Sequence, residues 1–292
     1  TLRSRGLGDV YKRQIQVSNG VLTIQSGVTI KAANDEFIYV EPGGAIAAMG
    51  TAAAPIIFSS LDSEVFSDVT RIDNYDRDSD AAEGEWIGII IEDNLANESK
   101  NELNYVIVAE AGKPASISGG NVVDAGITLI GDHEETLLRF VQVHDAYGDG
   151  IALRSALGNN LARMEAILIT GAGRDGISYT NFSGLIKDLL VIHRAGTYPN
   201  DGGDIRNGRA GLRAEAGSAN PTLFPLIVNA TLVGRDLSSA AADEINDEVG
   251  IVFADALPGI RLANVVFANF RNGCYQIESD VDLSGVLAAN AP

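Results

Sequence analysis

Several residue types are scarce in this sequence, and each scarcity excludes a class of protein. There is a single cysteine, so no disulfide can form within the chain and a disulfide scaffold is excluded. No run of 18 apolar residues occurs, so no membrane-spanning helix is predicted. With one tryptophan and nine phenylalanines against 32 glycines, the core is expected to be narrow and built from small and β-branched side chains.

Basic residues are also few: 21 Lys and Arg face 39 Asp and Glu, for a formal net charge of -18. Such a surface repels phosphate backbones and anionic lipids, so we predict no nucleic-acid partner and no polybasic membrane docking. It suits Ca²⁺, cationic partners or simple solubility. No glycine-rich phosphate loop, Ser-His-Asp spacing or Cys-His cluster is present, so no motif requires a cofactor.

The most informative feature is an internal repeat. The segments FVQV (140–143) and DGI (149–151) return, at an offset of 26, as AILI (166–169) and DGI (175–177). A glycine followed by an apolar residue recurs with spacings of 38, 24, 26, 35, 39 and 23. The three short spacings predict the basic coil of a solenoid, and the three long ones predict insertions. The glycines of the pattern are Gly88, Gly126, Gly150, Gly176, Gly211, Gly250 and Gly273.

Short β-branched strands precede most of these glycines, and no helical pattern lies between them. Near the start, residues 22–30 align with residues 38–46 at an offset of 16, which predicts a shorter coil there. We therefore predict an all-β fold, a right-handed parallel β-helix with coil spacings of 16 to 26 and loop insertions. A β-propeller is excluded because its blades need about 40 residues or more. The apolar residues after the glycines are predicted to stack as one internal ladder, namely Ile89, Ile127, Ile151, Ile177, Leu212, Ile251 and Cys274.

The central coils carry the main candidate site. If the repeat offset reflects direct stacking, Asp149 lies one rung, about 4.8 Å, from Asp175. Two like charges at that distance raise a pKa or bind a cation. The same alignment places His144 and His193 two rungs apart, about 9–10 Å, which is too far for one metal ion. Either these residues form the floor of a groove or they end turns and satisfy backbone groups; the set is His144, Asp145, Arg174, Asp175, His193 and Arg194.

Two further features are candidate binding elements. Asp76, Asp78 and Asp80 have the spacing with which a loop offers carboxylates to Ca²⁺. The match to an EF-hand loop is incomplete because Ala81 replaces the required glycine, so a solvated acidic loop is the alternative. Trp86 either covers the start of the next coil or stacks on a sugar from an exposed position.

Several segments carry a resemblance to a known group of proteins, namely 22–30, 43–46, 50–51, 55–58, 84–91, 140–144 and 149–151. They resemble the opening and middle coils of secreted or lipid-anchored right-handed β-helix proteins of environmental bacteria. This resemblance spans about residues 20–277 and implies a secreted or cell-surface location. Residues 1–14 resemble a translated sequencing-adapter scar, so we expect the β-helix domain to be 15–292, a fragment of a longer protein.

These observations leave open what the β-helix does. The first hypothesis is a non-catalytic surface module for adhesion, monomeric or part of a longer chain, that binds a polysaccharide or a cell-surface glycan. The alternative is a pectinase-like polysaccharide lyase or glycoside hydrolase, in which Asp149, Asp175 and Arg174 would be catalytic. A structural spacer within a surface protein is the third possibility.

Overall fold

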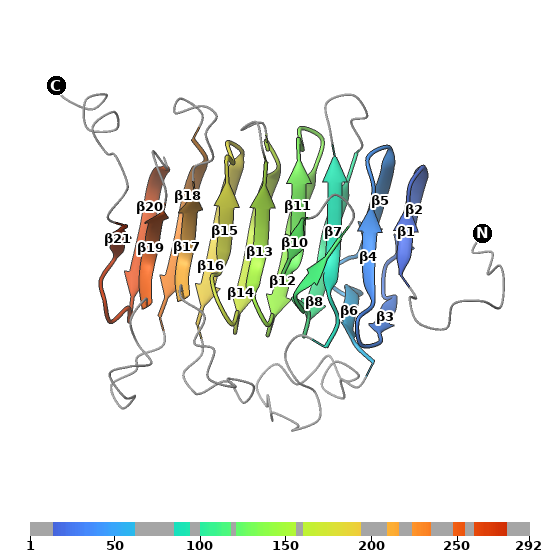
Figure 1. Ribbon diagram of the computed structural model, residues 1–292, viewed down its shortest axis with the longest axis horizontal. Helices are drawn as coiled ribbons and strands as arrows, with labels where there is room; N and C mark the ends of the chain where they lie inside the picture. Colours follow the sequence, from blue (N-terminus) through green and yellow to red (C-terminus); the bar gives the residue numbers. More distant parts are fainter. Residues whose placement is uncertain are drawn as a thin grey trace.

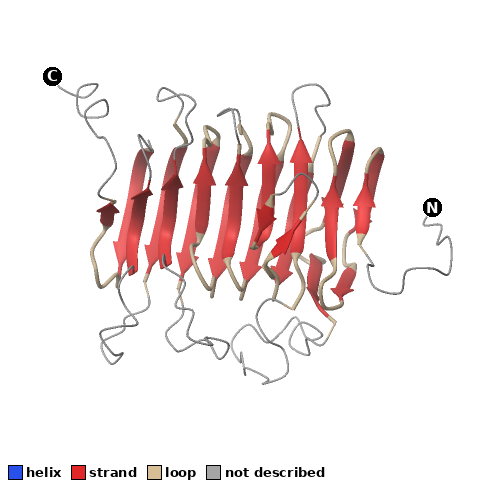
Figure 2. Cartoon of the chain, in the orientation of Figure 1, coloured by secondary structure: helices blue, strands red, loops and turns tan. Residues whose placement is uncertain are grey.

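A computed structural model describes residues 14–61, 85–93, 100–117, 121–155, 160–193, 209–215, 224–234, 248–254 and 260–278. Every regular element in these ranges is a β-strand, and no helix occurs among them (Figure 2). Accordingly, this part of the chain has no helix long and apolar enough to cross a membrane.

Two long sheets account for nearly all of the strands. Each coil contributes one strand to a nine-stranded sheet and then one or two to a ten-stranded sheet, and all neighbours within these sheets are parallel. The strands of the nine-stranded sheet are, in spatial order, β1 (Ile15–Val17), β4 (Phe37–Val40), β7 (Gly88–Asp93), β11 (Ala125–Gly131), β13 (Asp149–Arg154), β15 (Ile177–Thr180), β17 (Arg209–Glu215), β19 (Glu248–Ala254) and β21 (Tyr275–Ile277).

The ten-stranded sheet follows the same order along the solenoid. Its strands are β2 (Gly20–Gln25), β5 (Gly44–Met49), β8 (Glu102–Ala109), β12 (Leu137–His144), β14 (Arg163–Thr170), β16 (Leu185–Ile192), β18 (Leu226–Val233) and β20 (Arg261–Ala268), while β3 (Thr29–Ala32) pairs with β6 (Ile56–Ser60) and β6 with β8. The coils advance from the N-terminus to the C-terminus in one direction (Figure 1). The predicted all-β parallel β-helix is confirmed.

The predicted internal ladder is confirmed for six of its seven residues. Ile89, Ile127, Ile151, Ile177, Leu212 and Ile251 are paired in direct register through the nine-stranded sheet, and all are at most 1% exposed. The seventh assignment is wrong, because Tyr275 and not Cys274 pairs with Ile251. Cys274 is exposed and lies in register with Gly250. In the last coil the glycine–apolar pattern is therefore shifted by one position relative to the ladder.

The predicted short coil at the N-terminus is also wrong. Strand β2 pairs with β5 at an offset of 24, from Gly20 to Gly44, and β1 pairs with β4 at an offset of 23, from Ile15 to Ile38. Residues 22–30 run through β2 and β3, both in the ten-stranded sheet, whereas residues 38–46 pass from β4 in the nine-stranded sheet into β5 in the ten-stranded sheet. Both sheets have the same alternation of apolar and polar residues, so that alternation cannot tell one sheet from the other.

The outer faces of the two sheets differ in exposure. On the nine-stranded sheet the position after the ladder residue points outward, yet it is buried at Ile90, Thr128, Ala152, Ser178 and Val252. A small antiparallel hairpin of β9 (Ala115–Ser116) and β10 (Val122–Val123) contributes to this cover, since its side chains pack against Tyr39 and Ile90. The outer face of the ten-stranded sheet instead exposes charged and polar side chains along β12, β14 and β16.

A buried histidine links three coils on the inside of the turn between β11 and β12. His133 Nε2 lies 3.0 Å from the carbonyl oxygen of Ile130, which can only accept, so Nε2 carries the proton. Nδ1 then accepts from the Thr136 hydroxyl at 3.0 Å. Thr136 in turn accepts from Asn101 Nδ2 at 3.4 Å, and Asn101 Oδ1 accepts the Ile46 N–H at 3.1 Å.

This arrangement predicts a loss of stability in mild acid. Burial lowers the pKa of His133 from about 6.5 to about 4, so the histidine stabilises the fold above pH 6.5 and that contribution is lost as the pH falls toward 4. The linked loss is about 3 kcal/mol of unfolding free energy. Urea unfolding at several pH values should show it, and His133→Gln should lack this component. An equal acid loss in the variant would contradict the assignment.

Candidate functional site

The predicted stacking of Asp149 on Asp175 is confirmed by the register of β13 and β15. Ile151 pairs with Ile177, and the Gly150 N–H donates to the Asp175 carbonyl at 2.9 Å. Glycine is required at this bend because a Cβ on Gly150 would lie 2.5 Å from Ile169 Cγ2 in the core. Both aspartates are almost fully buried, at 1% and 2% exposure.

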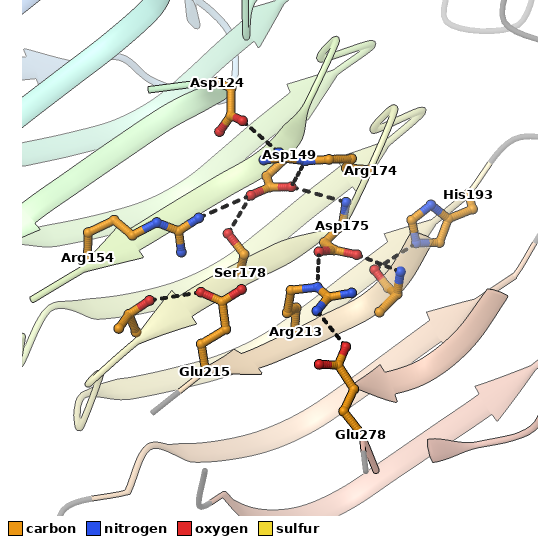
Figure 3. Close-up of polar contacts among 12 residues, drawn as sticks. Asp124, Asp149, Arg154, Arg174, Asp175, Ser178, His193, Arg213, Glu215 and Glu278 are labelled. Atoms are coloured by element: carbon orange, nitrogen blue, oxygen red, sulfur yellow. Dashed lines mark hydrogen bonds and ion pairs between the residues drawn. The ribbon is translucent and has the colours of Figure 1, made fainter. Parts of the chain in front are cut away.

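Asp149 is the centre of a polar network on the nine-stranded sheet (Figure 3). Its Oδ1 accepts from Arg174 Nε at 2.9 Å and from the Asp175 N–H at 3.3 Å. Its Oδ2 accepts a short hydrogen bond from Ser178 Oγ and lies 3.5 Å from Arg154 Nη2. Each oxygen of this buried carboxylate therefore has two partners.

The Asp175 side chain extends the network into the next coil, at β17. Its Oδ1 accepts the Ala210 N–H at 2.7 Å, and its Oδ2 accepts from Arg213 Nε at 2.9 Å. The same guanidinium reaches Glu278 Oε1 through Nη1 at 3.1 Å (Figure 3). Alternating charges thus cross-link the coils from β13 to β21.

The environment shifts the ionisation of Asp175. Burial raises its pKa, and the neighbouring Asp149 carboxylate raises it further, to about 8. Arg213, the Ala210 N–H and Arg174 oppose the shift without cancelling it. The environment therefore favours the protonated form of Asp175, as expected for two like charges in one site.

In contrast to Asp175, Arg174 is stabilised in its charged form. Its Nη1 lies 2.6 Å from Asp124 Oδ2, in addition to the contact with Asp149. Burial lowers the pKa of Arg174, but the charges of Asp149 and Asp124 outweigh burial and raise the pKa above its ordinary value. The guanidinium is therefore held in its charged form, which binds anions but cannot take up a proton.

His144, a predicted ligand-binding residue, lies in a different place. It ends β12 in the ten-stranded sheet, where it is half-buried on the outer face. Its Nδ1 lies 2.6 Å from Thr170 Oγ1, and its Nε2 lies 3.1 Å from Gln142 Oε1. His144 is in register with Thr170 of the next coil.

The predicted groove floor is not formed, because His193 faces the interior. Thr170 pairs with Ile192, so His193 stands one position further along and its side chain turns inward. There it is 3% exposed, donates from Nε2 to the Ala210 carbonyl at 3.1 Å, and packs edge-on against Phe270. The assignment of His193 to ligand binding is therefore wrong.

The side chain of Asp145 does not lie on the outer face either. It follows His144 in a left-handed conformation with φ of 53°, and its N–H donates to the Thr170 carbonyl at 2.9 Å. Its side chain is buried at 1% exposure. An external ligand cannot reach it, so Asp145 ends the strand and does not bind a ligand.

The predicted sugar-stacking role of Trp86 is wrong. Its side chain is 1% exposed and belongs to the main hydrophobic core. The indole Nε1 donates to the Ala109 carbonyl at 2.8 Å. Trp86 therefore covers the core at the start of β7, and no sugar ring can reach its face.

The remaining predicted residues lie outside the described residues. These are Arg194 and the proposed calcium ligands Asp76, Asp78 and Asp80. Among the residues that the structure does describe, no group of three or more His, Cys, Asp or Glu side chains is placed to hold a metal ion.

Sequence reasoning missed three side-chain partners of the stacked aspartates, Ser178, Arg154 and Arg213, and also Glu278, which pairs with Arg213. Ser178 and Arg213 each follow a ladder residue directly, so they occupy the outward position of their coil. Arg154 ends β13 and Glu278 follows β21, and both reach the network through long side chains. The ladder register would have identified Ser178 and Arg213, whereas the reach of Arg154 and Glu278 depends on rotamers that no sequence pattern encodes.

Comparison with known proteins adds two findings. A family model described as pectate-lyase like beta helix domain matches residues 9–291. A solved structure, an alginate lyase from Paenibacillus sp. str. FPU-7, is 10% identical over 90% of this chain and 99% of its own, with a TM-score of 0.23. No curated protein matches the sequence.

Proposed function

Because the chain belongs to the family of pectate-lyase-like β-helix domains, we propose that it acts on a polysaccharide of acidic sugars. The observation that carries this proposal is a group of three arginines from consecutive coils that surrounds the stacked aspartates. Arg154, Arg174 and Arg213 are 31%, 21% and 16% exposed, and each is held on its inner side by a buried carboxylate.

The guanidinium groups keep donors for a ligand. Among the described residues, the contacts of Arg174 and Arg213 use Nε and Nη1, which leaves Nη2 of each. Arg154 Nη1 also lacks a protein partner in this part of the chain, but it is buried and not open to a ligand. A sugar carboxylate is the group that best matches such planar donors.

The charge balance of the network is compatible with an anionic ligand. Asp124, Asp149, Asp175 and Glu278 supply four acids against three arginines, a net charge of -1 if all are ionised. Burial and the neighbouring Asp149 carboxylate raise the pKa of Asp175, which favours its neutral form and reduces the negative charge of the network. A linear polymer laid along the solenoid meets a new coil about every 4.8 Å.

The reaction that fits this chemistry is β-elimination. A guanidinium against a uronate carboxylate stabilises the anion formed when solvent water or hydroxide takes the C5 proton. The C4–O bond then breaks, a C4=C5 double bond forms, and the departing oxygen takes a proton from solvent water. Here the arginines bind substrate, and the buried Asp149 and Asp175 are positioning residues that orient them.

Binding without cleavage is the second candidate function. It is favoured by the burial of Asp149 and Asp175, because each carboxylate oxygen already accepts hydrogen bonds from protein donors. In this case the same arginines would retain the polymer and no product would form.

One experiment separates these functions. The purified chain is incubated with polygalacturonate, alginate and a neutral glucan, with and without Ca²⁺, while ultraviolet absorbance follows unsaturated products. Absorbance that rises with an acidic polymer supports the lyase. Retardation in a gel containing the acidic polymer, without product, supports the binding module. If neither acidic polymer is cleaved or retained, the proposal is wrong.

Arg154→Gln is the variant that tests the site. It removes the most exposed of the three guanidinium groups and one 3.5 Å ion pair, so the fold should persist. We expect affinity for the acidic polymer to fall about 10-fold or more, the worth of one charge-assisted hydrogen bond. Arg163→Gln, an exposed arginine in β14 of the other sheet, is the matched control and should change nothing.

A further inference from the structure

The ten-stranded sheet bends at the same register position in six successive coils. At each bend one residue adopts the left-handed conformation, with φ between 49° and 58°, and the regular pairing skips it. These residues form an outward-facing row along the solenoid, namely Tyr105, Phe140, Ala166, Asp188, Asn229 and Asn264.

The residue types in the later half of this row suit the left-handed backbone conformation found there. Asp and Asn tolerate the left-handed conformation better than other residues with a Cβ. The three side chains also form a ladder, with Asn229 Nδ2 donating to Asp188 Oδ1 at 2.9 Å and Asn264 Nδ2 donating to Asn229 Oδ1 at 2.8 Å. The left-handed backbone conformation therefore explains why these three positions carry Asp or Asn.

The aromatic residues at the start of the row are not explained in this way. A bulky side chain at positive φ is strained. Tyr105 and Phe140 nevertheless stack in parallel, with ring centroids 4.4 Å apart and planes 15° apart. Phe140 remains 40% exposed, and the Arg139 guanidinium carbon lies 5.8 Å from its ring centroid. Backbone strain that is retained at an exposed aromatic ring indicates a role in binding.

The row of large side chains is interrupted next to the Phe140 ring. Ala166 follows Phe140, and it offers only a methyl group where its neighbours have large side chains. The next side chain, Asp188, stands two rungs from Phe140, about 9–10 Å along the solenoid. Charged residues directly precede the row, Glu165 before Ala166 and Lys187 before Asp188, and both are partly exposed.

From this arrangement we propose a sugar-binding position in which a pyranose ring stacks on Phe140 above Ala166. The apolar face of the sugar would lie against the ring. Its hydroxyl groups would contact Glu165, Lys187 and Asp188. With Arg139, these side chains supply two positive and two negative charges, so the position suits a neutral hexose. It lies on the opposite sheet from the three arginines and does not depend on the function proposed there.

The test is affinity electrophoresis of the whole chain in gels that contain a neutral β-glucan or galactomannan. Wild-type protein should be retarded by at least one of these polymers. Phe140→Asn should weaken retardation at least 10-fold while the urea midpoint stays equal or rises, because asparagine fits the backbone better. A residue kept only for packing would instead lower the midpoint on replacement.

Further variants at the bends complete the test. Ala166→Leu fills the space beside Phe140 and should also abolish retardation. Asn264→Ala changes the same bend position three coils beyond Ala166 and should leave it unchanged, as should Arg154→Gln on the other sheet. The proposal is overturned if no neutral polymer retards the wild-type protein, or if Phe140→Asn and Ala166→Leu bind as it does.

Discussion

Replacing Asp149 with alanine is expected to lower the free energy of unfolding by about 3–5 kcal/mol, the cost of breaking a buried ion pair by removing one partner. Four groups lose their acceptor at once: the guanidinium groups of Arg174 and Arg154, the Asp175 N–H and the Ser178 hydroxyl. Because Asp149 is 1% exposed, water cannot replace these interactions without opening the coil.

Urea unfolding followed by circular dichroism measures this loss. Asp124→Ala is the matched control, since it also removes a carboxylate from Arg174 but one that is 17% exposed and forms a single ion pair. Its cost should be about 1 kcal/mol. Equal costs for the two variants would show that Asp149 is not the centre of the network.

Replacing Trp86 with alanine is the second change with a large expected effect, about 3–5 kcal/mol. The side chain fills the core at the start of β7, and its removal leaves a cavity that the surrounding strands cannot close. Trp86→Phe keeps much of the volume and loses the hydrogen bond to the Ala109 carbonyl, so we expect a smaller cost of about 1–2 kcal/mol.

The same residue provides the measurement. Trp86 is the only tryptophan in the chain, so its fluorescence should shift to longer wavelength as the core opens on unfolding. For Trp86→Ala, circular dichroism replaces fluorescence. Binding of a sugar polymer to either proposed surface should leave the Trp86 emission unchanged, because the indole is buried. A shift in emission on addition of a polymer would contradict this placement.

The two proposed surfaces follow from how each sheet is covered. The outer face of the nine-stranded sheet is largely buried, so its carboxylates are enclosed and paired with arginines whose outer sides stay partly exposed. The outer face of the ten-stranded sheet is open, so its side chains can contact solvent or a ligand. Buried polar groups need internal partners, whereas exposed ones do not.

The amino-acid sequence by itself determined the coil, the strand ladder and the stacking of Asp149 on Asp175. In a parallel solenoid a fixed offset along the chain becomes a fixed position in space. Two matching DGI segments at an offset of 26 therefore place their aspartates in adjacent rungs. For the same reason, the ladder from Ile89 to Ile251 was predictable from glycine spacing alone.

Only the tertiary structure decided which way side chains point and what they meet. Thr170 pairs with Ile192, an offset of 22, and an error of one in that offset was enough to place His193 on the wrong face, since a slip of one position exchanges the two faces of a strand. The arginines that neutralise Asp149 and Asp175 come from neighbouring coils, and the enclosure of Trp86 depends on packing between coils. Such contacts depend on three-dimensional neighbours, which local alternation of residues does not encode.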